Sequence, residues 1–322
     1  MLNALKFVNR ATADKDIIRA LTHICVHDGV LQGSDMRMSI GADCPELAGH
    51  SFTVPAEKFI KAIVACKGDP KIEHQADGTV KVSKGRFRVT LPALNAADYP
   101  TNSFKPGDAV QIGAPAGFLA ALRLIYPFIS RDASRPWSMG VCLRPDYFYA
   151  TNNVTLARVP MQWNGPLINL PNFVVEELLD INEPIKEIWA NKDAISFKFE
   201  GGWMRSQLYA DAWPESIPKM FDVTREFVPV PEGLLDAVEQ LIPFCPDVKF
   251  PSIHFTDGGI TTANGLQSAE IGFDWAGVGV YRAEVLQTVL RVATEWDPTA
   301  YPKPVFFNGK GIQGMMIGVR SL

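Results

Sequence analysis

The stretch that decides the fold reads His27-Asp28-Gly29-Val30-Leu31-Gln32-Gly33-Ser34-Asp35. Its pattern returns twice, at intervals of about 110 residues, as Arg144-Pro145-Asp146-Tyr147-Phe148-Tyr149-Ala150-Thr151-Asn152 and as Thr256-Asp257-Gly258-Gly259-Ile260-Thr261-Thr262-Ala263-Asn264. Each copy predicts a turn, then a short alternating strand, then a small residue leading into Ser, Thr or Ala and an Asp or Asn. A pattern repeated at this distance indicates one domain design used three times.

The composition is that of an ordinary globular protein. A chain of 322 residues is long enough for two or three domains with their own cores. No apolar stretch approaches the roughly 18 residues of a membrane span, and the start Met1-Leu2-Asn3-Ala4-Leu5-Lys6 lacks the features of a secretory signal. The five cysteines are scattered and include no Cys-x-x-Cys pair, which favours buried free thiols. We therefore expect a cytoplasmic protein with no membrane contact.

The helical pattern divides the chain into three similar thirds. Residues 1–107, 108–222 and 223–322 are predicted to be separate domains, each with two amphipathic helices and several hairpin strands. The first helices are expected at 2–12, 116–128 and 231–241, and the second begin near Pro55, Pro171 and Arg282. These elements predict an α+β fold with the helices packed on one face of antiparallel sheets.

Charge is distributed unevenly among the thirds. The net charge of −4 argues against a simple basic DNA-binding patch. The first third has 14 Lys and Arg against 11 Asp and Glu, whereas the others have 10 against 13 and 7 against 11. Only the first third is therefore net basic.

Several segments are similar to a known family. Phe52–Ile60, Lys84–Pro100, Ala150–Ala157 and Met315–Leu322 resemble, in the same order, segments of the bacterial DNA polymerase III beta sliding clamp. The resemblance covers nearly the whole chain. It implies three repeated clamp domains in each protomer and a head-to-tail homodimer closed into a ring around duplex DNA.

The resemblance also implies a function. Such a ring is a non-enzymatic processivity factor that holds a DNA polymerase on its template and needs no cofactor. A ring stays on DNA by topology, so its phosphate contacts can be weak and independent of sequence, which permits sliding. The implied partners are double-stranded DNA, the polymerase and the clamp loader, the last two bound through short peptide motifs.

The sequence departs from the family in three places. The strand that usually precedes the first helix is missing, although the middle third has one at Ala109–Gly113. The family's Gly-His-Arg in the peptide pocket is Asn153-Val154-Thr155, which suggests a changed peptide preference. Acidic residues mark outward helix faces of the later thirds: Glu176, Glu177, Asp180, Glu232, Asp236 and Glu239. The compact chain and altered pocket suggest a phage-type clamp.

Two sets of residues are candidate binding sites. The predicted phosphate contacts are Lys6, Arg10, Lys15, Lys58, Lys61, Arg123, Arg131, Arg282 and Arg291. The resemblance implies a partner-peptide pocket, for which the candidate residues are Thr151, Asn153, Val154, Leu156, Pro214, Pro218, Met315, Met316, Ile317, Val319 and Arg320. The competing interpretations are a solvated helix face for the first set and an ordinary core strand for part of the second.

Other motifs carry no chemistry. Gly309-Lys310-Gly311-Ile312-Gln313-Gly314 matches a dinucleotide fingerprint, but too little chain follows for a helix, so a hairpin turn is favoured. His23 and His27 stand on a predicted strand with no further ligand nearby, so no metal site is expected. Two alternatives to the clamp remain open: a scaffold of the same fold that does not encircle DNA, and an enzyme whose site is assembled from distant residues.

Overall fold

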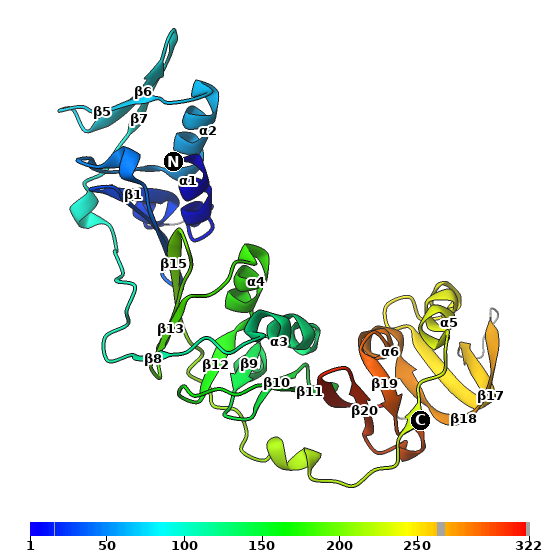
Figure 1. Cartoon of the computed structure of the whole chain (residues 1–322). Helices are drawn as coiled ribbons and strands as arrows, with labels where there is room; N and C mark the ends of the chain where they lie inside the picture. The colour runs from blue at the N-terminus through cyan, green and yellow to red at the C-terminus, as the bar shows by residue number, and fades with distance from the viewer. Residues whose placement is uncertain (16, 263–267, 320–322) are drawn as a thin grey trace. The chain divides into compact units, whose positions relative to one another are not determined.

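The computed structural model describes residues 1–15, 17–262 and 268–319, without the side chains of 274–276. The chain divides into two compact units (Figure 1). Unit 1 comprises Met1–Ala114 and Asn182–Leu208, and unit 2 comprises Pro115–Ile181 and Tyr209–Leu322. Each unit is described by itself.

Among the described residues, unit 1 contains two antiparallel sheets and two α-helices. The larger sheet has the order β4-β1-β2-β3-β15-β14-β13-β8, and the smaller has the order β5-β6-β7. The helices are α1 (Leu2–Asn9) and α2 (Ala56–Cys66). The strands are β1 (His23–His27), β2 (Val30–Ser34), β3 (Met38–Asp43), β4 (Ser51–Pro55), β5 (Lys71–His74), β6 (Thr79–Lys84), β7 (Phe87–Pro92), β8 (Val110–Ile112), β13 (Glu187–Ala190), β14 (Ala194–Lys198) and β15 (Gly202–Gln207).

Unit 2 repeats this arrangement with four helices. Its larger sheet has the order β12-β9-β10-β11-β21-β20-β19-β16, and β17 pairs with β18. The helices are α3 (Phe118–Ile125), α4 (Asn172–Ile181), α5 (Leu234–Leu241) and α6 (Ala283–Leu290). The strands are β9 (Gly140–Leu143), β10 (Tyr147–Thr151), β11 (Thr155–Pro160), β12 (Ile168–Pro171), β16 (Val228–Pro229), β17 (Ser252–Thr262), β18 (Glu270–Arg282), β19 (Ala293–Trp296), β20 (Val305–Gly309) and β21 (Ile312–Met316).

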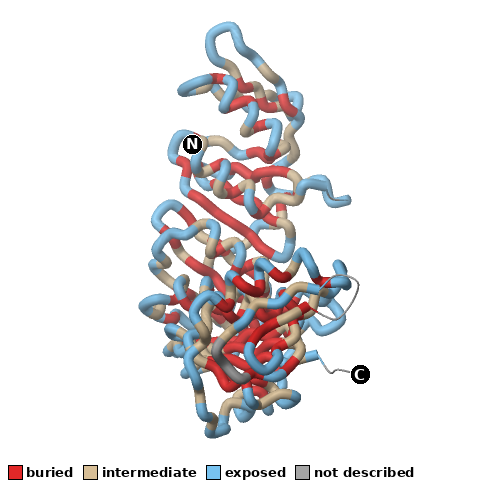
Figure 2. Tube along the Cα trace, turned by 90° about the vertical axis from the view of Figure 1, so that its right-hand side faces the viewer, coloured by how far each residue is buried: buried red, intermediate tan, exposed pale blue. Residues whose placement is uncertain are grey.

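The helices pack in pairs on the sheets. α1 contacts α2 as well as β2 and β3, α3 contacts α4, and α5 contacts α6. Each helix buries one apolar stripe, such as Leu5 and Val8 on α1 and Phe59 and Ile63 on α2. Figure 2 shows buried residues along the strands and the inner sides of the helices, with exposed residues on the turns. The described residues thus confirm the α+β fold and all six expected helices.

The turn of the first repeat copy has the expected conformation. Asp28 and Gly29 both have positive φ, 46° and 76°, between the paired strands β1 and β2. Two consecutive residues with positive φ form the tight hairpin turn whose twist matches that of the strands. This turn places Leu31 and Gln32 of β2 opposite Val26 and Cys25 of β1.

Each large sheet is made of strands from two different thirds. In unit 1, β3 pairs with β15, and Ile40 lies opposite Met204. In unit 2, β11 pairs with β21 in the same way, and Ala157 lies opposite Gly314. We call these two pairings the sheet junctions. Each large sheet thus continues from one third into the next. The domain boundaries at residues 107 and 222 stay a prediction.

One detail differs from the sequence expectations. The third repeat copy forms no hairpin turn, because Asp257 and Gly258 lie inside β17, where the register with β18 shifts as in a β-bulge. The hairpin turn favoured for the Gly309–Gly314 segment lies at Lys310-Gly311, since Gly309 pairs with Ile312. The last strand ends at Met316. The five cysteines are buried and free, as expected.

Candidate functional site

The helices of unit 1 present basic side chains to solvent. Lys6 and Arg10 are four residues apart, so they share the face of α1 that lies opposite buried Leu5 and Val8. Both side chains are exposed, as is that of Lys15 in the following loop. Among the described residues, Lys6 has no ion-pair partner, whereas Arg10 has an interaction within the chain. This outer face therefore retains positive charge.

The second helix of unit 1 continues this basic surface. Lys58 and Lys61 are three residues apart on α2 and both are exposed. Lys61 forms an ion pair with Glu57, but both side chains are more than two-thirds exposed, at 72% and 78%. An exposed pair of this kind contributes little to stability, so Lys61 can exchange its partner. α1 and α2 together form the basic helix face.

The predicted cations of unit 2 are all exposed but have other surroundings. Arg291 lies 3.3 Å from the carboxylate of Glu239 on α5. Arg282 lies over the ring of Phe250, 4.8 Å from its centroid. Arg123 on α3 also has an interaction within the chain. These contacts compete with phosphate binding.

Arg131 belongs to a small polar cluster between α3 and α4. The hydroxyl of Tyr126 donates a hydrogen bond to Glu176. Partial burial and this carboxylate raise the pKa of Tyr126, and Arg131 acts in the opposite direction through a hydrogen bond and its charge. The exposed acids Glu176 and Asp180 further reduce the positive potential of this helix pair. The basic character is thus strongest in unit 1.

Leu156 and Met315 of the predicted peptide pocket belong to a cluster of buried apolar residues in unit 2. We call it the aromatic cluster: Cys142, Tyr149, Leu156, Trp213, Ile217, Phe306 and Met315, with Trp137, Tyr147, Phe221 and Phe227 packed against it. Met315 lies opposite both Leu156 and Phe306, so these side chains form a row across β11, β21 and β20. The loop from Trp213 to Phe221 covers this row.

Two arginines pack on the rings of the aromatic cluster. The guanidinium of Arg158 lies 4.3 Å from the ring centroid of Tyr147 and 4.2 Å from that of Phe221, and its Nε donates to Gln313. Arg225 lies 5.0 Å from the ring centroid of Phe306. Stacked guanidinium groups keep donors available at the rim of an apolar surface. Burial raises the pKa of Tyr149, and Arg158 counteracts this shift.

The structure separates the predicted pocket residues into core and surface. Thr151, Leu156 and Met315 are buried, and Met316 is fully buried on the opposite face of β21, since neighbouring strand residues alternate. Ile317 is 48% exposed and donates its backbone N–H to the carbonyl of Val154, which is half-buried like Asn153. The remaining members are Pro214 and Val319, which are exposed, and Pro218, which is half-buried. Arg320 lies outside the described residues.

Sequence reasoning missed the aromatic members of the cluster. On the 213–218 segment it selected Pro214 and Pro218, whereas the buried anchors are Trp213 and Ile217. The indole N–H of Trp213 is buried and has no hydrogen-bond partner among the described residues. Strand alternation could have identified Tyr149, because it shares a face of β10 with the predicted Thr151.

The described part of the chain contains no group of three or more His, Cys, Asp and Glu that could hold a metal ion. Over the same residues, no helix combines the length and the apolar character that crossing a membrane requires.

Comparisons with known proteins identify the fold. No protein-family model and no curated protein sequence matches the chain. Among solved structures, the chain is similar to a DNA polymerase sliding clamp from Caulobacter crescentus (18% identity, TM-score 0.83, covering 99% of this chain and 97% of that one). It is also similar to the sliding clamp from Bacillus subtilis (17%, TM-score 0.81, 100% and 97%). A third is a sliding clamp, DNA polymerase III subunit beta, from Pseudomonas aeruginosa bound to griselimycin (16%, TM-score 0.80, 100% and 97%). The chain therefore has the fold of the bacterial beta sliding clamps.

Proposed function

We propose that this chain is a cytoplasmic DNA sliding clamp, a non-enzymatic ring of two copies that encircles duplex DNA and tethers a replicative polymerase. The observation that carries this proposal is the repetition of the sheet junctions. Two junctions occur within the chain, and each pairs two types of strand. Among the described residues, one further strand of each type has an unpaired edge. Two copies joined head to tail would pair these edges and close a ring.

The leftover edges belong to β7 and β18. β7 occupies the place of β15 and β21, because Val89 pairs with Val82 as Met204 pairs with Phe197. The start of β18 occupies the place of β3 and β11, because Ile271 pairs with Ile260 of the third repeat copy as Ala42 pairs with Leu31 of the first. Within the described residues, β7 pairs only with β6 and β18 only with β17. An unpaired edge exposes backbone groups that a complementary strand would satisfy.

The junction register predicts which residues would meet between copies. Phe87 of one copy would lie opposite Ile271 of the other, as Gly202 lies opposite Ala42. The next pair along would be Arg88 and Glu270, which are both exposed and have opposite charges. An apolar pair beside an ion pair is the cross-strand pattern that stabilises antiparallel strands. This complementarity supports the head-to-tail arrangement independently of the family resemblance.

The basic helix face supports DNA contact. Exposed lysines on α1 and α2 would interact with phosphates without reading sequence. Cations on unit 2 with nearby acids would contribute less. A ring of two copies would thus have two basic sectors, which agrees with a sliding contact that does not pin the DNA.

The surface of the aromatic cluster supports partner binding. Val154 and Ile317 offer apolar side chains beside the buried row of Leu156 and Met315. Trp213 and Phe221 pack beside this row, and Arg158 and Arg225 lie on rings of the cluster. Anchors of this kind, aromatic and surrounded by arginine, are typical of protein interfaces. We assign this surface to the peptide motifs of the polymerase and the loader.

A threading assay tests the ring without a loader. Linear DNA with biotin at both ends is mixed with the protein and then capped with streptavidin, or capped first and mixed afterwards. A ring should remain on the DNA through a wash in about 0.5 M salt only when the protein is added before the caps. Salt screens the phosphate contacts, but it does not release a closed ring from capped DNA. A scaffold of the same fold, which the acidic faces of α4 and α5 would suit, should give the same result in both orders.

The basic helix face predicts the behaviour of a double variant. Lys6→Glu with Lys58→Glu should weaken DNA binding by more than tenfold and flatten its salt dependence. Each lost phosphate contact removes roughly 0.9 from the slope of log K against log salt. Fluorescence anisotropy at several salt concentrations measures both effects. Arg291→Gln is the matched control, and an equal loss in that variant would contradict the assignment to unit 1.

A further inference from the structure

We propose that the outer edge of β5 accepts an extended segment of a partner protein as an added antiparallel strand. The segment would have an apolar-polar-apolar triplet whose apolar side chains enter a cavity beside Ile72. Within the described residues, β5 pairs only with β6, and its other edge is open. The inference does not depend on ring closure, which involves β7 and β18.

The other two thirds show what covers the equivalent edge. β8 pairs with β13, with Ile112 opposite Ile188 and Val110 opposite Ala190. β16 pairs with β19, with Val228 opposite Trp296. β5 has the same place, because Ile72 pairs with Val82 as Ile188 pairs with Phe197. The described residues therefore provide two templates for a strand that β5 lacks.

Ile72 is more exposed than its counterparts in the other two thirds. Ile188 is 0% exposed and Trp296 is 1% exposed under their covering strands. Ile72, in the same position, is only half-buried. The covering residue Ile112 is itself 3% exposed. An added strand would give Ile72 the burial that its counterparts already have.

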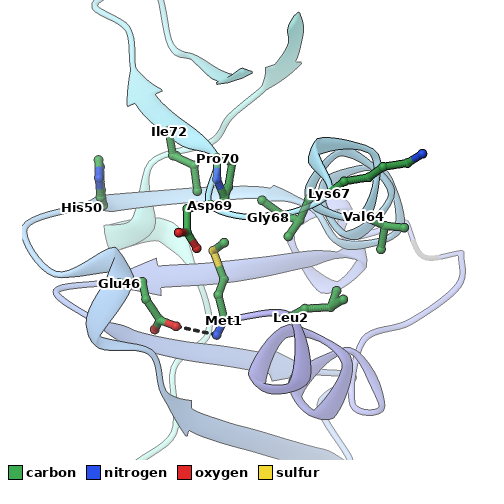
Figure 3. A pocket seen from close by; sticks show the side chains of 11 residues that line it. Met1, Leu2, Glu46, His50, Val64, Lys67, Gly68, Asp69, Pro70 and Ile72 are labelled. Carbon is green, nitrogen blue, oxygen red and sulfur yellow. Dashed lines mark hydrogen bonds and ion pairs between the residues drawn. The ribbon is translucent and has the colours of Figure 1, made fainter. Parts of the chain in front are cut away.

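A cavity of about 620 Å³ lies beside the open edge. It is bounded by the start of α1, the end of α2 and the segment leading into β5 (Figure 3). Leu2, Ile63, Val64 and Ile72 provide apolar walls. This volume is within the roughly 300–1,000 Å³ of ligand pockets, so two aliphatic side chains can be accommodated.

The rim of the cavity determines the chemistry of the occupant. Glu46 and Asp69 supply negative charge and Lys67 supplies positive charge, while Glu46 accepts a 2.7 Å hydrogen bond from the amino group of Met1. Neither sign dominates, so an uncharged triplet like that of β8 fits best. Backbone hydrogen bonds would supply affinity, and the alternate side chains would supply specificity.

The direct probe is a synthetic peptide of residues 108–114, Asp-Ala-Val-Gln-Ile-Gly-Ala, with a fluorescent label. We expect saturable binding by the full chain in anisotropy, together with slower amide exchange in residues 71–74. The peptide with Gln111→Pro should bind at least tenfold more weakly, because proline lacks the N–H and disrupts strand pairing. This control leaves the protein unchanged.

Protein variants test the same contact from the other side. Ile72→Asp should reduce peptide affinity at least tenfold, whereas Ile17→Asp, at a fully exposed position, should not change it. Absence of binding at about 1 mM peptide, or binding insensitive to Gln111→Pro and Ile72→Asp, would overturn the proposal. A further outcome is slow amide exchange in residues 71–74 without peptide, in a self-associated form that Ile72→Asp dissociates. That outcome would assign the edge to a second copy instead. A negative result in the peptide experiments leaves the result expected in the threading assay unchanged. Failure of this inference is therefore distinguishable from failure of the proposed ring.

Discussion

Ile271→Asp is expected to leave a folded monomer that no longer remains on capped DNA. In the proposed ring, Ile271 packs against Phe87 of the other copy at both interfaces. An unpaired carboxylate buried there costs about 3 kcal/mol or more per interface, which corresponds to a loss of over 100-fold in affinity for each. Analytical ultracentrifugation measures the mass, and the threading assay measures retention. Phe87→Asp, at a position 37% exposed in the single chain, should have the same effect.

A charge exchange tests the register of this interface. Arg88→Glu places two acids opposite each other and should weaken the dimer, and Glu270→Arg should do the same with two bases. The double variant should recover most of the affinity, because the pair is restored with its signs reversed. A dimer that survives Ile271→Asp would refute this interface. Lack of recovery in the double exchange would refute only the register.

Gly309→Ala is expected to destabilise the fold by about 3 kcal/mol. Gly309 ends β20 opposite Ala293, the first residue of β19. A Cβ at this position would clash with the carbonyl oxygen of Val292, which is backbone and cannot turn aside. Either β19 or the end of α6 would have to move. Urea unfolding followed by circular dichroism measures the loss as a lower midpoint.

Gly113→Ala is the matched control for this variant. A Cβ at Gly113 would meet no atom within 4 Å, so its effect should stay within about 0.5 kcal/mol. Equal stability of the two variants would show that β19 and β20 separate more easily than their pairing indicates. A fall in stability at Gly309 alone would confirm the close approach.

The sequence by itself determined the local elements and their repetition. Helical spacing identified all six α-helices of the described residues, because an amphipathic helix places its apolar residues by local geometry alone. The Asp28-Gly29 turn was equally local, since both residues tolerate positive φ. The threefold pattern and the family resemblance together predicted the clamp fold. The basic character of α1 and α2 could also be read from charge and spacing.

The tertiary structure alone decided how the elements join. The third repeat copy matches the other two in sequence, yet Asp257 and Gly258 continue a strand, because pairing with β18 outweighs the turn preference. The aromatic cluster gathers Tyr149, Trp213 and Phe306 from segments far apart in the chain. The open edge of β5 becomes apparent only from the strand pairings of the described residues. Strand pairing depends on which distant backbone groups meet, and the side-chain pattern of one strand does not specify its neighbour.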